Sequence, residues 1–162
     1  MPNWTFNTLT LTGTEEDISK VKAQLNQTFE VPSQKPFEDE IVMFTNTDPV
    51  LSFWNIIAPT DLDNYPLQPG ITKNAPDNYK SENTWYNWNC SNWGCKWDAS
   101  APRLKTDEPN NLQYTFDTPW GAPIPAIEKL AEQYPNLLVE MFSEYEEGGT
   151  EYLKWNEQEE LV

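Results

Sequence analysis

Half of the eight tryptophans lie in one short stretch, which constrains the fold more than any other feature of the sequence. Residues Ser81–Asp98 carry Trp85, Trp88, Trp93 and Trp97, together with both cysteines. An enclosed aromatic side chain buries roughly 150–250 Å², so these four outweigh any other segment in burial. We predict a short helix that packs into the core. The alternative is an exposed aromatic platform for a ligand or for nucleobases.

Residue types at both ends of this stretch support a helix. Ser81 and Asn83 are suited to cap a helix N-terminus, and Gly94 is typical of a helix end. Trp85 and Trp88 would then lie one turn apart on one face.

Charge is the strongest global feature of the chain. The net charge is −16 over 162 residues, a length that fits one domain. Binding to nucleic acid depends on Lys and Arg neutralising phosphates, so neither free nucleic acid nor an anionic membrane is an expected partner. The sequence holds no apolar run of about 18 residues and no secretory signal, which predicts a cytoplasmic protein.

Cys90 and Cys95 are the only cysteines, and histidine is absent. Two thiols without histidine cannot complete a four-ligand zinc site of the usual Cys/His kind. A lasting disulfide is disfavoured in the cytosol. We therefore expect buried free thiols, no metal and no cofactor. A bridge or a catalytic thiol is the less favoured alternative.

Hydrophobic periodicity gives an α+β order of elements. The predicted elements are a strand at Trp4–Thr12, a helix from Thr14 to about Gln27, a strand at Ile41–Thr45, a strand or buried helix at Val50–Ile57, a strand at Leu112–Phe116, a helix from Pro123 to Tyr134, and a hairpin of Leu137–Tyr145 with Thr150–Trp155. Phe29–Asp39, Pro59–Lys80 and Arg103–Asn111 are predicted connections. In the first strand Trp4 and Phe6 share one face and Leu9 and Leu11 the other. Either both faces are covered or a bulge intervenes.

Two β-α-β halves in succession predict one ferredoxin-like domain over residues 1–162. Its antiparallel sheet would be covered on one face by helices. An insertion at about residues 58–111 would hold a long loop and the tryptophan-rich helix.

Several motifs occur in the order found in one family. The matching stretches include Pro2–Trp4, Phe53–Pro59, Trp85–Trp88, Asn92–Asp98, Thr118–Pro123 and Tyr134–Leu137. They resemble phage and plasmid proteins that contain the YubB-type ferredoxin-like domain. The resemblance implies a ferredoxin-like fold and a mobile-element origin, and it implies no established activity. Cys95 stands where the family usually has threonine, which supports treating the cysteine pair as incidental.

No catalytic residues are predicted. Histidine, the usual general base near neutral pH, is missing, and the sequence contains neither a phosphate-cradling glycine loop nor a nucleophile elbow. We therefore expect a non-enzymatic protein.

Two binding hypotheses remain. The first is an acidic accessory protein in the host cytosol that binds and inhibits a basic, nucleic-acid-binding host protein, as an anti-CRISPR or anti-restriction inhibitor that competes with nucleic acid. Its predicted partner-binding residues are Glu140, Glu144, Glu146, Glu147, Glu151, Glu157, Glu159 and Glu160. Inhibition by steric or allosteric means is equally compatible with the family.

The alternative is a module that binds single-stranded nucleic acid or nucleotides through the tryptophan-rich segment. Its predicted residues are Trp93, Lys96, Trp97, Arg103 and Lys105. A simpler reading is that Lys96 covers a tryptophan face through a cation–π contact.

Overall fold

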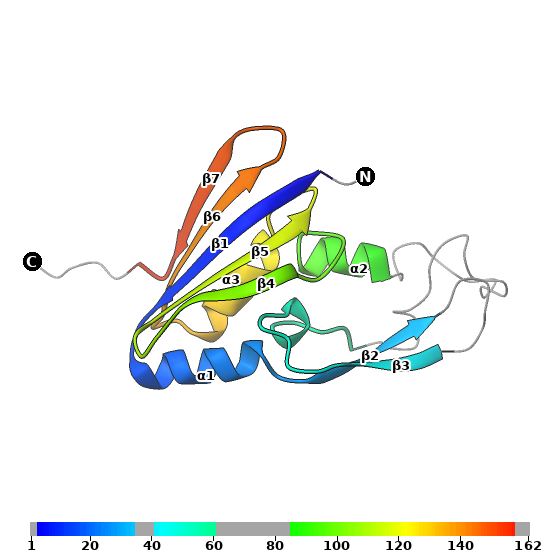
Figure 1. Ribbon diagram of the computed structural model, residues 1–162, viewed down its shortest axis with the longest axis horizontal. Helices are drawn as coiled ribbons and strands as arrows, with labels where there is room; N and C mark the ends of the chain where they lie inside the picture. The colour runs from blue at the N-terminus through cyan, green and yellow to red at the C-terminus, as the bar shows by residue number, and fades with distance from the viewer. Residues whose placement is uncertain (1–2, 35–40, 61–84, 158–162) are drawn as a thin grey trace, which may run out of the picture.

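The computed structural model describes residues 3–34, 41–60 and 85–157, and its centre is a five-stranded antiparallel sheet (Figure 1). The strand order is β4-β5-β1-β6-β7. The strands are β1 (Trp4–Thr12), β4 (Ser100–Glu108), β5 (Asn111–Pro119), β6 (Leu138–Tyr145) and β7 (Thr150–Trp155). β1 lies in the middle and pairs with both β5 and β6. The predicted strands at residues 4–12 and 112–116 and the predicted C-terminal hairpin are confirmed.

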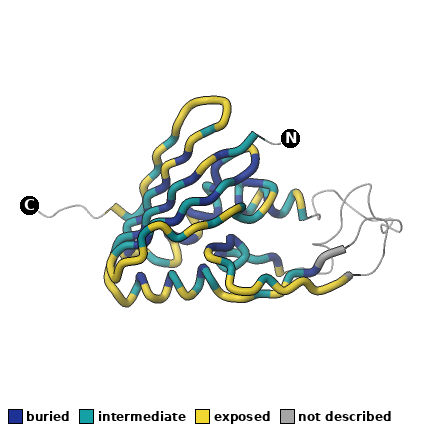
Figure 2. Tube along the Cα trace, viewed as in Figure 1, coloured by how far each residue is buried: buried dark blue, intermediate teal, exposed yellow. Residues whose placement is uncertain are grey.

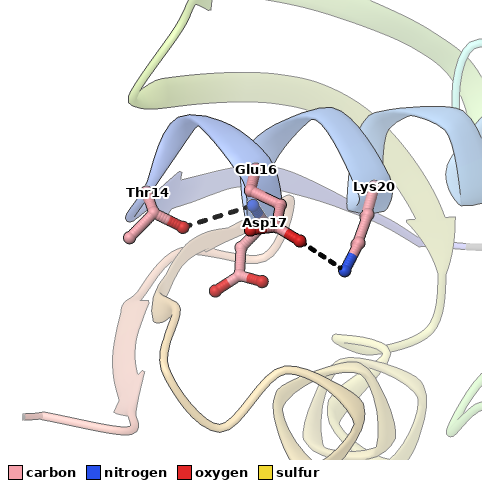
Figure 3. A network of polar contacts seen from close by, with 4 residues as sticks. All are labelled: Thr14, Glu16, Asp17 and Lys20. Atoms are coloured by element: carbon pink, nitrogen blue, oxygen red, sulfur yellow. Dashed lines mark hydrogen bonds and ion pairs between the residues drawn. The ribbon is translucent and has the colours of Figure 1, made fainter.

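Helix α1 (Glu15–Leu25) begins at a capping residue. The hydroxyl of Thr14 accepts a hydrogen bond from the backbone N–H of Asp17 at 3.2 Å, and Lys20 pairs with Glu16 at 3.0 Å on the exposed side (Figure 3). Acidic side chains in the first turn also suit the positive end of the helix dipole. The cap and the acidic first turn fix where the chain turns from β1 into α1.

Both long helices pack on the same face of the sheet. α1 contributes buried residues at helical spacing, and α3 (Ile124–Gln133) does the same. These buried residues are Ile18, Val21 and Leu25 of α1 and Ala126, Ile127, Leu130 and Ala131 of α3. They form one hydrophobic core with Leu9, Leu11, Leu112 and Val139 of the strands. The prediction of a sheet with helices on one face is therefore confirmed.

Four further elements lie between α1 and β4. They are β2 (Phe29–Gln34), β3 (Ile41–Asn46), the short 3-10 helix η1 (Phe53–Asn55) and α2 (Trp85–Asn92). β2 and β3 pair only with each other, as a ribbon beside the main sheet, and most of β3 is exposed (Figure 2). Much of the predicted loop, residues 61–80, lies outside the described residues, as do the predicted caps Ser81 and Asn83.

The prediction of a connection at Phe29–Asp39 is wrong for residues 29–34. Pro32 argues against a strand because it has no N–H to donate. In a two-stranded ribbon the backbone groups on the outer edge of each strand need no partner strand. A proline, which lacks the N–H, is therefore tolerated at position 32, opposite Met43. The predicted strand at Ile41–Thr45 is confirmed. Val50–Ile57 is neither a strand nor a regular α-helix, because its centre forms the single turn η1.

The prediction of a connection at Arg103–Asn111 is also wrong, because residues 100–108 form β4. This strand is at the edge of the sheet, and its register shifts between Ser100 and Arg103 and again between Leu104 and Thr106. Charged residues and bulges commonly protect a sheet edge from pairing with other chains. The same features make the segment polar and irregular, which is why it looks like a loop in the sequence.

The tryptophan-rich helix is confirmed as α2, and Gly94 follows its end with a φ of +89°. A Cβ on Gly94 would lie 2.5 Å from Cδ of Pro125, so the segment meets the start of α3 closely here. Asp98 ties this segment to η1. Its carboxylate accepts hydrogen bonds from the Ser52 hydroxyl and, at 2.7 Å, from the backbone N–H of Phe53.

The irregular hydrophobic pattern of β1 arises neither from a bulge nor from burial on both faces. The register of β1 with β5 is continuous from Trp4 to Thr12. Leu9 and Leu11 lie on the helix-covered face. The preceding residue on that face is Asn7, which is polar but buried. Asn7 donates to the Thr118 hydroxyl at 3.0 Å and accepts from the Ser143 hydroxyl at 2.8 Å. Phe6 therefore points to the opposite face, where it is 44% exposed.

Candidate interaction face

The face of the sheet opposite the core carries three exposed aromatic side chains. Phe6 of β1, Phe142 of β6 and Tyr152 of β7 are 44%, 38% and 54% exposed. Phe142 pairs with Thr8 of β1 on one side and with Tyr152 of β7 on the other. Phe6 lies two residues before Thr8 in β1 and therefore faces the same side. Side chains at these positions are within reach of one another across the strands. We call Phe6, Phe142 and Tyr152 the aromatic patch.

Carboxylates surround the aromatic patch. Phe6 lies between Glu144 of β6 and Asp117 of β5 in the strand register. Glu140 accepts a hydrogen bond from the Tyr152 hydroxyl at 2.5 Å, and this bond raises the pKa of the phenol. The face therefore presents acidic groups next to apolar rings. We call the aromatic patch together with Asp117, Glu140 and Glu144 the open face.

Cations lie near the sheet edges on this side. Arg103 of β4 pairs with Thr115, next to Asp117. Burial raises the pKa of the Asp117 carboxyl, and the nearby Arg103 charge opposes that rise. Lys154 of β7 forms an ion pair with Glu157 at 3.4 Å. Arg103 lies beside Asp117, and Lys154 pairs with Glu140 in the register of β6 and β7. Glu144 is opposite Phe6 and Thr150 and has no cation opposite it in the register.

The predicted acidic residues that the structure describes do not share one surface. Only Glu140 and Glu144 lie on the open face. Glu146 and Glu147 occupy the turn between β6 and β7, and Glu151 accepts a hydrogen bond from the Tyr145 hydroxyl at 2.8 Å. Glu157 pairs with Lys154. The last two predicted residues, Glu159 and Glu160, lie outside the described residues.

The predicted tryptophan site is divided between core and surface. Trp93 is 2% exposed, and its indole N–H donates to the Ile57 carbonyl at 2.9 Å. It meets Phe53 and Trp88 edge to face, with ring centroids 5.9 and 5.5 Å apart. Trp93 therefore belongs to the core and offers no platform for a base.

Trp97 lies at the surface but is partly covered. The Lys96 ammonium lies 4.6 Å from the centre of the Trp97 ring, a cation–π contact, and also approaches Tyr86 at 6.0 Å. This is the simpler arrangement anticipated for Lys96. Arg103 and Lys105 are exposed on β4, whereas Trp93 lies in the core.

Both cysteines are free thiols, with Cys90 half-buried and Cys95 buried. Burial raises the pKa of the Cys95 thiol, with the Asp98 carboxylate adding to the effect. A buried, protonated thiol is a poor nucleophile. Among the described residues no group of three or more acidic, cysteine or histidine side chains is arranged to hold a metal ion.

The residues that sequence reasoning missed are Phe6, Phe142 and Tyr152. A signal was present for one of them, because strand alternation places Phe142 on the same side as Glu140 and Glu144. The sequence did not show which side of that strand the helices cover.

The strand order and helix placement define an α+β ferredoxin-like domain with an extra edge strand, β7. The family described as "Ferredoxin-like domain in Api92-like protein" matches residues 92–159, from the end of α2 through β7 and just beyond. No curated protein and no solved structure matches the chain. None of the helices in the described ranges is long and apolar enough to cross a membrane.

Proposed function

We propose that this chain is a non-enzymatic accessory protein of a phage or plasmid that binds a basic, nucleic-acid-binding protein of the host cytosol through its open face. The observation that carries the proposal is the set of exposed aromatic rings placed among carboxylates on an uncovered side of the described sheet. Aromatic residues dominate the binding energy of many protein interfaces. Acidic groups around them select a positively charged partner and speed its association.

The net charge of −16 supports a protein partner over free nucleic acid. A host enzyme that holds DNA or RNA presents a basic groove, which an acidic surface complements. The proposed consequence is inhibition of such an enzyme, for instance a CRISPR or restriction nuclease, by competition with nucleic acid. The mobile-element origin belongs to this proposal and is supported by the resemblance of the motifs noted above.

One observation favours a second function. Ferredoxin-like sheets can stack nucleobases on exposed aromatic side chains, and the aromatic patch occupies such a face. Arg103 is the cation best placed to contact a phosphate there. The surrounding carboxylates Asp117, Glu140 and Glu144 would repel the phosphate backbone, so we rank this function second.

Charge reversal on the open face separates the two functions. We expect Glu140→Lys with Glu144→Lys to abolish the capture of basic nucleic-acid enzymes from host lysate, because the new charges repel the same partner. The control is Glu128→Lys with Glu132→Lys, which changes net charge equally at two exposed positions on α3. The measurement is the amount of such an enzyme retained at low and at high salt, with and without a competing oligonucleotide.

The expected result is capture that is lost at high salt, displaced by the oligonucleotide and intact in the control pair. Equal loss in both pairs would mean that only net charge matters and would contradict a role for the open face. Retention of the oligonucleotide itself by the unmodified protein would support the second function instead.

A further inference from the structure

A small hollow lies at the end of the sheet, where β1 begins. It has a volume of about 160 Å³, and its lining includes Trp4, Trp120, Tyr145, Glu146 and Glu147. A water molecule occupies about 30 Å³ in the liquid, so the hollow has room for the head group of a long side chain. Trp4 shares its strand face with Phe6, so the wall of the hollow that Trp4 forms adjoins the open face.

Trp120 is held in the hollow at an energetic cost. Its φ is +69°, a left-handed conformation that bulky residues rarely adopt. Its backbone N–H donates to the Asn3 carbonyl at 2.7 Å, which fixes this turn against the start of β1. The side chain is 64% exposed, so core packing does not explain why a tryptophan occupies a strained position. Such outliers are common at ligand sites.

The two carboxylates of the hollow are fixed by neutral donors. Glu146 accepts a hydrogen bond from the backbone N–H of Trp4 at 2.6 Å, and Glu147 accepts one from the side-chain amide of Asn3. None of the ion pairs between described residues includes Glu146 or Glu147. Two negative charges are therefore held beside two indole rings, and neither forms an ion pair with a cation of the described residues.

We infer that this hollow binds an organic cation, namely the guanidinium or alkylammonium group of a basic side chain. Indole rings attract cations through their π faces, and carboxylates form strong hydrogen bonds with the same groups. An anion or a phosphate is excluded by the charge of Glu146 and Glu147. The identity of the ligand rests on the proposed function. If a basic protein docks on the open face, the hollow anchors one of its Arg or Lys side chains.

Small cations test the hollow without any partner. We expect ethylguanidinium and tetramethylammonium to shift the indole N–H signal of Trp4 saturably in NMR spectra, with dissociation constants in the millimolar range. Ethylurea, a neutral analogue of ethylguanidinium, and sodium chloride at equal ionic strength should produce no such shift. Preference for ethylguanidinium would indicate an arginine-like ligand, and preference for tetramethylammonium a methylated ammonium.

Matched variants locate the binding. Trp120→Leu and Glu147→Gln should each weaken cation binding about tenfold or more, which corresponds to a loss of about 1.4 kcal/mol. Tyr152→Leu removes an aromatic ring from the open face, and Glu128→Gln removes a carboxylate from α3. Neither should change cation binding. Equal shifts with ethylurea, or unchanged binding in Trp120→Leu and Glu147→Gln, would overturn the inference.

Failure of the hollow and failure of the proposed function give different results. If the hollow is inactive but the open face docks the partner, cation shifts are absent while the Glu140 and Glu144 reversal still abolishes capture. If the hollow binds cations but the chain has no basic partner, the cation shifts appear and capture does not. If both hold, Trp120→Leu also weakens capture about tenfold.

Discussion

Replacing Trp93 by alanine should lower the free energy of unfolding by about 4 kcal/mol, as large aromatic truncations in a packed core usually do. The side chain is 2% exposed and packs edge to face against Phe53 and Trp88. Its removal also leaves the Ile57 carbonyl without the indole N–H that it accepts at 2.9 Å. Chemical denaturation followed by far-ultraviolet circular dichroism measures the change.

Trp120→Ala provides the control, because the same side chain is removed from a position that is 64% exposed. We expect a change below about 1 kcal/mol, as for most surface substitutions. If Trp93→Ala does not fold, Trp93→Phe should fold with a smaller loss, since it keeps a ring in the core. Equal losses for Trp93→Ala and Trp120→Ala would show that Trp93 is not internal.

Replacing Asp98 by alanine should cost about 3 kcal/mol, because it leaves several donors without an acceptor in a partly buried place. The donors are the Ser52 hydroxyl and the backbone N–H groups of Phe53 and Ala99. The control is Asp107→Ala, which breaks an exposed ion pair with Lys22 and should cost less than about 1 kcal/mol. A similar small loss at Asp98 would mean that η1 does not depend on this carboxylate.

Acidification should enlarge the Asp98 effect. Burial raises the pKa of the Asp98 carboxyl above its ordinary 3.8, against the opposing hydrogen bonds from Ser52 and Phe53. A raised pKa in the folded state means that protonation favours folding. Above the pKa that Asp98 has in the folded state, the ionised carboxylate destabilises the folded state in full. This destabilisation decreases as the pH falls from that pKa towards 3.8. The stability difference between the unmodified protein and Asp98→Ala should therefore widen over that window.

Periodicity predicted the parts of the fold that are held by one apolar face. The stripe of Ile18, Val21 and Leu25 located α1, and the alternation around Tyr114 located β5. Both patterns arise because each element buries a single face against the same core, so the local sequence contains the information.

The elements that were missed lack such a face. β2 contains Pro32 and pairs with β3 in a separate ribbon, so its strand conformation depends on the partner strand and not on an alternating apolar face of its own. β4 is an edge strand whose alternation is interrupted twice and whose main apolar contact with the core is Leu104. Their structure follows from pairing between segments, which a local pattern does not report.

The open face was missed for a related reason. Alternation groups Phe142 with Glu140 and Glu144, but the aromatic patch also needs Phe6 and Tyr152 from two other strands. Only the register brings these three together. The buried polar residue Asn7 further disguised β1, because a polar side chain on the core face makes the exposed face look like the apolar one.

Site-specific photocrosslinking in host cells tests the central claim most directly. A photoreactive benzoylphenylalanine at position 142 should crosslink to a basic nucleic-acid-binding protein, because this position lies in the aromatic patch, whereas the same group at Glu128 on α3 should not. Crosslinks from position 128 but not from 142 would contradict docking through the open face. Crosslinks from position 142 to nucleic acid would contradict a protein partner.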